Sequence, residues 1–398
     1  MIQPFHASGG SRIAGLALGM TLAAAAMTVT PAFAATGCTD GTIPIGDDCG
    51  SVDMLAGDVG FIVEKAMEDF HLTAVIVNVR VGDTQIIRKA FGTSMAGIPA
   101  TPEMHFRNGS VAMAYLSTVL LRLVEEGTLS LDDTVSKWFP DWPKADAVTL
   151  RMLITTTSGY ADYVNLDYLP LYEDPFRQYG PGELIDIGLS QPMVCDPGTC
   201  FAYAHTNFVI LGEILARATG KPTAELIRTY VLDPLGLEDT KSEDTPVIQQ
   251  PVLQAYTGER GMVEDSTYWN PSWTLAKGAI MTTDIDDLMA TGVAIGTGSL
   301  LSEASHALQL GPETAGMKPF NDTVYYAMGL VVNNGWVMQN PMFAGYSAAF
   351  ATLPERGIAI AVAATSGGKT PDNARPHEVL WTEIASLLAP DHAPLSKK

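Results

Sequence analysis

His105-Phe-Arg-Asn-Gly-Ser110-Val-Ala-Met113 opens the stretch of sequence that decides the fold of this chain. Residues 111–121 contain no charged side chain, and Arg122 and Glu125 follow at the end of the run. A run of this length is too short to cross a bilayer. Apolar residues on every face of a helix instead indicate a helix buried in the middle of a large protein. We therefore expect a central helix that begins after Ser110.

Ser110 has two interpretations at this position. A serine on a Gly-Ser turn at a helix start can be a nucleophile, with backbone N–H groups nearby to stabilise an oxyanion. Serine is also a favoured helix N-cap, because its hydroxyl accepts a hydrogen bond from the first turn. Caps greatly outnumber nucleophiles, so this stretch taken alone favours the cap.

Residues 1–34 have the pattern of a secretory signal peptide. Arg12 supplies a positive start, Ile13–Ala26 an apolar run, and Ala32-Phe-Ala34 a small-residue cleavage site. Cys38 follows Thr36-Gly37 as in a lipoprotein acylation box, although Ala35 stands where a large aliphatic residue is expected. We expect an exported protein, secreted or in the cell envelope, without a transmembrane segment after cleavage. The pattern favours a soluble form over a lipid anchor on Cys38.

Length and charge bound the function. Removing residues 1–34 from 398 leaves 364, which is ample for a large core. The formal net charge of the whole chain is −21. Such a chain repels phosphate backbones and anionic lipid headgroups, which excludes nucleic acid and a polybasic membrane contact as partners. The expected partner is a small-molecule or peptide substrate.

The four cysteines form two local pairs, Cys38/Cys49 and Cys195/Cys200. In an exported protein, local pairs predict two small disulfide loops. The alternative is free or metal-binding cysteines, but no cluster of histidines accompanies them, so we expect no metal. Ser366-Gly-Gly-Lys369-Thr370 ends like a phosphate loop but lacks the leading glycine at Ala363, and it is interpreted as a turn. No cofactor is implied.

Hydrophobic periodicity predicts how the chain is organised. An amphipathic helix over 59–70 precedes a hairpin whose strands meet at Gly82-Asp83, and residues 110–300 are mostly helical. The β pattern returns beyond residue 320, and a helix over Pro376–Leu388 closes the chain. The predicted elements are strands at Leu72–Val81, Thr84–Phe91, Val324–Val332, Gly345–Leu353 and Ile358–Ala364, and helices near 149–155, 182–189, 206–218, 223–231 and 284–292.

These elements predict an α/β (α+β) fold in which both ends of the chain build one antiparallel sheet, flanked by terminal helices, with a mostly helical lobe inserted. We expect the sheet lobe to comprise 52–109 and 320–390 and the helical lobe 110–319. The other predicted segments are the signal peptide 1–34, an irregular lead-in over 35–51 pinned by Cys38–Cys49, and a tail over 391–398.

Five motifs follow one another along the chain. They are the Ser110 stretch, Thr156-Thr-Ser-Gly159, Tyr203-Ala-His205 after Asp196-Pro-Gly, Ala276-Lys-Gly278, and Gly345-Tyr-Ser-Ala before Pro354-Glu-Arg-Gly. In this order they resemble the serine β-lactamase-related family of class C β-lactamases, D-alanyl-D-alanine carboxypeptidases and related esterases. The resemblance covers about residues 55–390. It implies a β-lactamase/DD-peptidase-like fold, a cleft between two lobes, and Ser110 as the nucleophile.

The sequence departs from all three catalytic motifs of that family. Ser110-Val-Ala-Met113 stands for Ser-x-x-Lys, Tyr203-Ala-His205 for Tyr-x-Asn, and Gln339-Asn-Pro341 for Lys-Thr-Gly or His-x-Gly. The lysine of the first motif would lie one helical turn from the serine, on the same face, and help to remove its proton. The serine and tyrosine remain, and the cationic groups are replaced.

Two hypotheses follow. In the first, the protein is a serine hydrolase that cleaves an ester, amide or peptide bond, with Ser110, Tyr203 and His205 as catalytic residues and His205 as altered general base. Lys277 could then supply the missing cation, and the candidate substrate-binding residues are Lys277, Gln339, Met342 and Gly345. In the second, Met113 fills the volume of the lysine, and the protein is a pseudoenzyme that binds cell-wall peptides or a partner. A hydrogen bond between His205 and Ser110 would separate the two.

Overall fold

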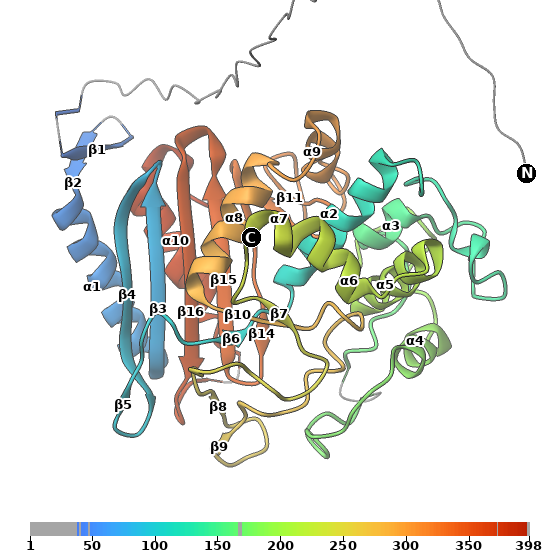
Figure 1. Cartoon of the computed structure of the whole chain (residues 1–398), viewed down its shortest axis with the longest axis horizontal. Helices are drawn as coiled ribbons and strands as arrows, with labels where there is room; N and C mark the ends of the chain where they lie inside the picture. The colour runs from blue at the N-terminus through green and yellow to red at the C-terminus, as the bar shows by residue number, and fades with distance from the viewer. Residues whose placement is uncertain (1–37, 40, 47, 166–168, 372, 396–398) are drawn as a thin grey trace, which may run out of the picture. The chain divides into compact units, whose positions relative to one another are not determined.

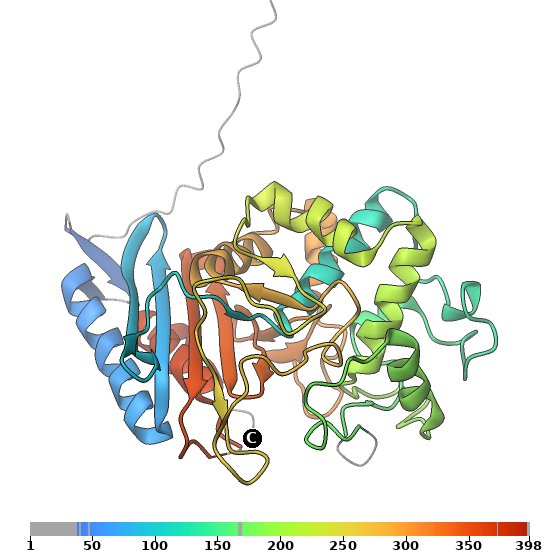
Figure 2. The same cartoon turned by 60° about the horizontal axis from the view of Figure 1, so that its bottom comes forward.

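The computed structural model describes residues 38, 39, 41–46, 48–165, 169–371 and 373–395 (Figure 1). These residues form an antiparallel sheet with helices packed on both faces, as the sequence predicts (Figure 2). The predicted signal peptide lies outside the described residues, as do residues 396–398 of the predicted tail. Within the described ranges, no helix has the length and apolar character needed to cross a bilayer.

The main sheet has nine strands and is built from both ends of the chain. Its order is β11-β12-β13-β15-β16-β3-β4-β5, β14 pairs with β15, and all pairs are antiparallel. The late strand β16 therefore lies beside the early strand β3. The strands of this sheet are β3 (Leu72–Val81), β4 (Thr84–Met95), β5 (Ile98–Pro99), β11 (Val324–Tyr326), β12 (Val331–Asn333), β13 (Trp336–Gln339), β14 (Met342–Phe343), β15 (Tyr346–Leu353) and β16 (Ile358–Ser366).

The two faces of the sheet carry different cores, because successive strand residues point to opposite faces. On β3, Val75 and Val77 face a core shared with α1 (Val52–Phe70) and α10 (Pro376–Leu388), whereas Ala74 and Ile76 face the larger core that contains α2. Figure 1 shows α8 (Ile285–Thr297) across this second face.

Helix α8 approaches the sheet closely through two glycines one turn apart. A Cβ atom at Gly292 would lie 3.0 Å from Phe350 Cβ, and one at Gly296 would lie 2.3 Å from Thr352 Oγ1. Larger residues would force the helix away from β15. This helix packs on the sheet although the sequence analysis assigned it to the helical lobe.

The helical part of the chain surrounds α2 (Val111–Glu125), which is the uncharged helix predicted after Ser110. Every α2 residue from Val111 to Leu121 is buried. The other helices are α3 (Leu150–Ile154), α4 (Pro181–Ser190), α5 (His205–Thr219), α6 (Thr223–Ile227), α7 (Asp233–Leu235) and α9 (Glu303–Gln309), with a π-helical turn at Arg228–Leu232 and 3₁₀ turns at Val135–Lys137, Pro354–Arg356 and Pro390–His392. The remaining short strands are β6 (Phe106–Arg107), β7 (Lys241–Ser242), β8 (Tyr256–Thr257), β9 (Glu264–Asp265) and β10 (Met281–Thr283).

Two expectations about local structure are wrong. The lead-in is not irregular, because β1 (Thr42–Ile45) and β2 (Asp48–Ser51) form a hairpin that the Cys38–Cys49 disulfide closes. The predicted strand Val324–Val332 is instead the hairpin β11/β12. Gly329 has φ +72° there, and Ala327 N–H bonds Leu330 O at 2.8 Å, so the chain turns where a continuous strand was expected.

Candidate active site

Ser110 is positioned at the start of α2 by the residues before it. Asn108 donates its backbone N–H to Met281 O of β10 at 2.9 Å. Gly109 has φ +45°, a backbone conformation that favours glycine. A Cβ atom on Gly109 would lie 2.6 Å from Pro341 Cβ. Glycine at this position therefore lets Pro341, which leads into β14, pack against the turn that carries Ser110.

The Ser110 hydroxyl does not cap α2. Ser110 occupies the residue before the helix, with φ −64° and ψ −10°, and its side chain accepts no hydrogen bond from the first turn. By contrast, the side chains of Ser51, Thr149 and Ser302 each accept such a bond at the start of α1, α3 and α9. The interpretation of the Ser110 side chain as an N-cap is therefore wrong, and its hydroxyl is available for another role.

Met113 lies one turn along α2, where the family resemblance implies a lysine. Its side chain is fully buried. The Tyr203 hydroxyl donates to Met113 Sδ at 3.4 Å, and the Tyr326 hydroxyl donates to the same sulfur at 3.7 Å. A thioether is an uncharged, weak acceptor. Two phenols thus surround an apolar group one helical turn from Ser110.

Tyr203 connects this cluster to Ser110. The residue is 38% exposed, but its hydroxyl points inward to Met113. Burial raises the pKa of the Tyr203 phenol well above its ordinary value, and hydrogen bonding with Ser110 opposes part of that rise. Burial also raises the pKa of Tyr326. Both phenols are therefore neutral at physiological pH.

His205, at the first position of α5, is paired with a carboxylate. Its ring Nδ1 lies 3.0 Å from Asp162 Oδ2, and its backbone N–H donates to Asp162 Oδ1 at 3.0 Å. A carboxylate can only accept, so Nδ1 carries a proton, and the tautomer fixed in this way places the lone pair on Nε2. The His205 ring packs edge-on against Tyr203, with centroids 5.2 Å apart. The described residues contain no hydrogen bond between His205 and Ser110.

A disulfide loop holds Tyr203 and His205 in place. The Cys195–Cys200 bond forms as the sequence predicts, and Cys38–Cys49 forms as well. The loop is hydrogen-bonded to the Thr156–Gly159 motif: Val194 N–H to Gly159 O at 2.8 Å, Gly198 N–H to Thr157 O at 2.8 Å, and Ala202 N–H to Thr156 O at 3.0 Å. The segment between the disulfide and α5 is therefore fixed against the helical part of the chain.

Gln339 supports α2 through the turn between β11 and β12. It is 3% exposed, and its Nε2 donates to Gly329 O at 2.7 Å, while its Oε1 accepts from Asn340 N–H. A Cβ atom on Gly329 would lie 2.6 Å from Met113 O, so the β11/β12 turn packs directly against α2. Both ends of the Gln339 amide are thus used within the protein.

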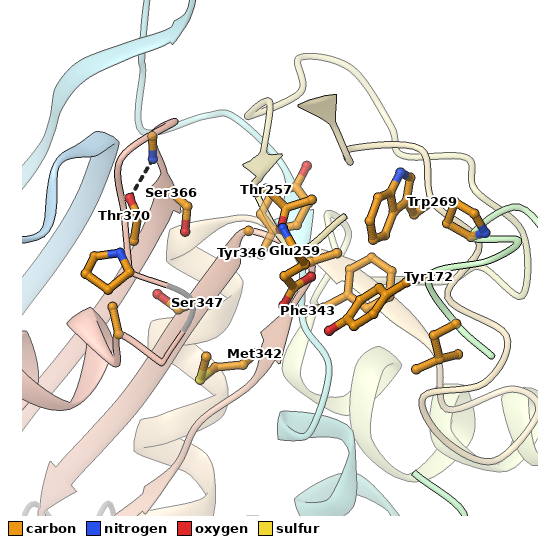
Figure 3. A pocket seen from close by; sticks show the side chains of 18 of the residues that line it. Tyr172, Thr257, Glu259, Trp269, Met342, Phe343, Tyr346, Ser347, Ser366 and Thr370 are labelled. Carbon is orange, nitrogen blue, oxygen red and sulfur yellow. Dashed lines mark hydrogen bonds between the residues drawn. The ribbon is translucent and has the colours of Figure 1, made fainter. Parts of the chain in front are cut away.

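Met342 and Gly345 line a cavity of about 160 Å³, shown in Figure 3. Met342, the first residue of β14, directly follows Pro341, which packs against Gly109, so the cavity wall begins one residue after the contact with the Ser110 turn. Gly345 has φ +91°, and a Cβ atom there would lie 2.2 Å from Tyr256 O. The glycine lets β8 approach the edge of the sheet and form one wall.

Lys277 lies in a different surrounding from the other candidates. It is exposed and lines one hollow with Gln178 and Asp244 and another with Glu213. Neither hollow includes Ser110 or Met342 among its lining residues. Its surroundings are those of an exposed charge beside α4 and α5.

Two residues of the site were not singled out from the sequence. Asp162 lies three residues after the Thr156–Gly159 motif, and a carboxylate that close to a family motif was the available signal. Tyr326 lies in a β-rich run with no distinguishing pattern. Its role depends on the hairpin turn that brings it to Met113.

A model of the family described as Beta-lactamase matches residues 62–381. Among curated relatives, penicillin-binding protein 4 of Amycolatopsis lactamdurans is 29% identical over 226 residues, covering 53% of this chain and 58% of the relative. Esterase EstB of Burkholderia gladioli is 28% identical over 200 residues, covering 46% and 51%. The chain therefore spans about half the length of these curated relatives.

Solved structures share the fold at low sequence identity. A D-stereospecific amidohydrolase from Streptomyces sp. superposes with a TM-score of 0.71 at 21% identity, covering 83% of this chain and 98% of that one. The D-amino acid amidase of Ochrobactrum anthropi SV3, complexed with L-phenylalanine amide, gives 0.72 at 23%, with the same coverage. Because the family match extends over most of the chain and the fold agrees with it, this protein belongs to the Beta-lactamase family.

Proposed function

We propose that this protein is an exported serine hydrolase that forms an acyl-enzyme on Ser110. The observation that carries the proposal is the placement of Ser110: it begins a buried helix, its hydroxyl makes no cap, and the Tyr203 phenol is hydrogen-bonded to Met113 one turn along the same helix. Membership of a family that includes hydrolases supports it. Two disulfides and the predicted signal peptide support export.

The proton of Ser110 needs a base that is not lysine. Tyr203 is neutral, so it can accept the serine proton only while giving up its own. His205 is the candidate acceptor, because Asp162 holds the ring with its lone pair on Nε2. In the proposed step, Ser110 Oγ bonds the acyl carbon while its proton passes by way of the Tyr203 hydroxyl to His205, whose ring lies edge-on to Tyr203 with centroids 5.2 Å apart. His205 then gives that proton to the leaving oxygen as the bond between this oxygen and the acyl carbon breaks. Water then repeats the sequence and releases the acid.

Esters are the substrate class that suits this site best. An alkoxide or phenolate leaves with less protonation than an amine, so cleavage of an ester depends less on a strong proton donor. Loss of general-base assistance typically costs ~10²–10⁴ in rate. A site with Met113 in place of a cation is therefore expected to favour esters over amides and peptides.

The second candidate is a binding protein without catalysis. It is favoured by the absence, among the described residues, of a hydrogen bond between Ser110 and His205. The thioether of Met113, bonded by two phenols, also suits a site that has given up proton transfer. The family fold and cavity would then hold a ligand without cleaving it.

Intact-protein mass spectrometry tests the proposal. Wild type, Ser110→Ala and the exposed control Ser190→Ala would each be incubated with a fluorophosphonate, a p-nitrophenyl acyl ester and a penicillin. We expect a stoichiometric adduct on wild type and Ser190→Ala from the fluorophosphonate and the ester, and none on Ser110→Ala. Absence of labelling on all three proteins would favour the binding protein.

A further inference from the structure

The cavity beside β14 is lined by acidic and aromatic side chains (Figure 3). Among the described residues, its lining includes two carboxylates, Asp174 and Glu259, and no lysine, arginine or histidine. Six aromatic side chains line it as well: Tyr172, Tyr179, Trp269, Trp273, Phe343 and Tyr346. A lining of carboxylates and aromatic faces attracts cations and repels anions.

The lining residues are arranged in two sides with an acid between them. In Figure 3, Tyr172 and Trp269 stand on one side, Ser347, Ser366 and Thr370 on the other, and Glu259 lies between. The Tyr172 and Trp269 ring centroids are 6.4 Å apart, so the rings form a tilted pair. Trp269 is 4% exposed, and its indole N–H has no acceptor among the described residues, so a bound oxygen could satisfy it.

Basic residues near the cavity do not neutralise the negative charge of its lining. Arg177, Arg260 and Arg375 adjoin lining residues in sequence but pair with Glu183, Glu264 and Glu378 respectively. Lys369 adjoins Thr370, is exposed and does not line the cavity.

A buried arginine also lies behind the cavity wall. Arg107 is 2% exposed, its guanidinium carbon is 6.0 Å from the Phe343 ring centroid, and its N–H groups bond the carbonyls of residues 245–247. It therefore lies behind Phe343 and not on the cavity surface.

We propose that this cavity binds an aromatic substrate group that carries an ammonium charge, with the ring packed against the Tyr172/Trp269 pair and the ammonium at Glu259, and that it discriminates against carboxylates. A volume of about 160 Å³ accommodates one ring and a short chain. The link to cleavage rests on the proposed function, because Met342 and Pro341 connect the cavity to the Ser110 turn. The charge preference itself does not require catalysis.

Binding to the full chain carrying Ser110→Ala tests this preference without turnover. The probes are 2-phenylethylammonium and 3-phenylpropionate, which share a ring and chain but have opposite charges. Calorimetry and the fluorescence of Trp269 and Trp273 would report binding. We expect the ammonium probe to bind about tenfold more tightly than the carboxylate. Equal binding, tighter binding of the carboxylate, or no binding of the ammonium probe would overturn the proposal.

Two further variants locate the charge preference. Glu259→Gln in the same background should reduce the preference to about twofold or less, because the carboxylate is removed at constant size. Glu173→Gln is the matched control, since Glu173 is exposed and does not line the cavity, and it should leave the preference unchanged. An unchanged preference in Glu259→Gln would contradict the assignment. Failure of Ser110 labelling would overturn the hydrolase proposal and leave this binding result as it stands.

Discussion

The surroundings of Ser110 and the cavity beside β14 differ in the charged and polar groups that they contain. Around Ser110, the position one helical turn along α2 holds the neutral thioether of Met113, and His205 is hydrogen-bonded to Asp162. In the cavity, carboxylates stand among aromatic rings. Among the described residues, neither Met113 nor the lining of the cavity presents a cation, so we expect both regions to disfavour an anionic substrate.

A lysine at position 113 should have the largest effect on the acylation of Ser110. Met113→Lys would place an ammonium between Tyr203 and Tyr326 and provide a nearby base for Ser110, so we expect acylation by p-nitrophenyl esters to rise ~10²-fold or more. The buried charge should also lower the free energy of unfolding by a few kcal/mol, on the order of 3. Met113→Leu is the control, with a stability change under ~1.5 kcal/mol and unchanged acylation. A Lys variant that folds but acylates no faster would show that the missing lysine is not what limits the site.

Removing the proposed base should reduce acylation. His205→Ala is expected to slow acylation ~10²-fold with little change in KM, because the ring acts on a proton and not on substrate binding. Asp162→Asn should have a smaller effect in the same direction, because an amide at this position no longer fixes the proton of the His205 ring on Nδ1. The rate of p-nitrophenolate release checks both variants. His392→Ala, in the 3₁₀ turn that follows α10, is the control. Equal rates in wild type and His205→Ala would exclude the histidine as base.

The two disulfides provide a matched comparison of position. Cys195→Ser/Cys200→Ser should lower both stability, by ~2 kcal/mol, and acylation, because the closed loop holds the segment that carries Tyr203. Cys38→Ser/Cys49→Ser should lower stability by ~3 kcal/mol without slowing acylation. Urea unfolding and ester hydrolysis measure the two effects. Loss of activity in the lead-in variant would mean that the β1/β2 hairpin also shapes the site.

Asp287, which is neither a proposed catalytic residue nor a residue that lines the cavity, should make the free energy of unfolding depend on pH. Burial raises the pKa of Asp287 to about 6, and a hydrogen bond from Thr240 opposes part of that rise. Between its unfolded pKa of ~3.9 and 6, the folded state holds a proton that the unfolded state releases, so the free energy of unfolding falls as pH rises through this window. Because Asp287 is half-buried, the expected fall is discounted to ~1–2 kcal/mol.

Urea unfolding of Asp287→Asn at pH 4 and pH 7 measures this contribution. The amide keeps an oxygen to accept from Asp239 N–H and Thr240, so the variant should fold and should lack the fall. The same fall in the variant would assign the pH dependence to other groups.

The sequence allowed the sheet and central helix to be predicted because their signals are local. Leu72–Val81 and Pro376–Leu388 have the bounds that periodicity indicated, and the uncharged run after Ser110 is α2. The Val324–Val332 run gave a wrong strand, because Gly329 turns to pack against Met113 O, and that contact is tertiary.

The site was less accessible from sequence, because its geometry depends on segments far apart in the chain. Ser110 and Tyr203 were proposed through the family motifs, and their interaction depends on the loop that Cys195–Cys200 closes. The pairing of His205 with Asp162 required the start of α5 to pack against the segment after Gly159. The acidic cavity combines residues from around 172, 259, 343 and 370, and no single stretch of sequence indicated it.

The pre-steady-state release of p-nitrophenolate tests the central claim most directly. Wild type and Ser110→Ala would be mixed rapidly with a p-nitrophenyl ester, and the protein mass would be followed in parallel. An activated Ser110 predicts a burst of one equivalent of p-nitrophenolate together with an acyl adduct on wild type, and neither on Ser110→Ala. The same slow release from both proteins, with no adduct, would contradict the account.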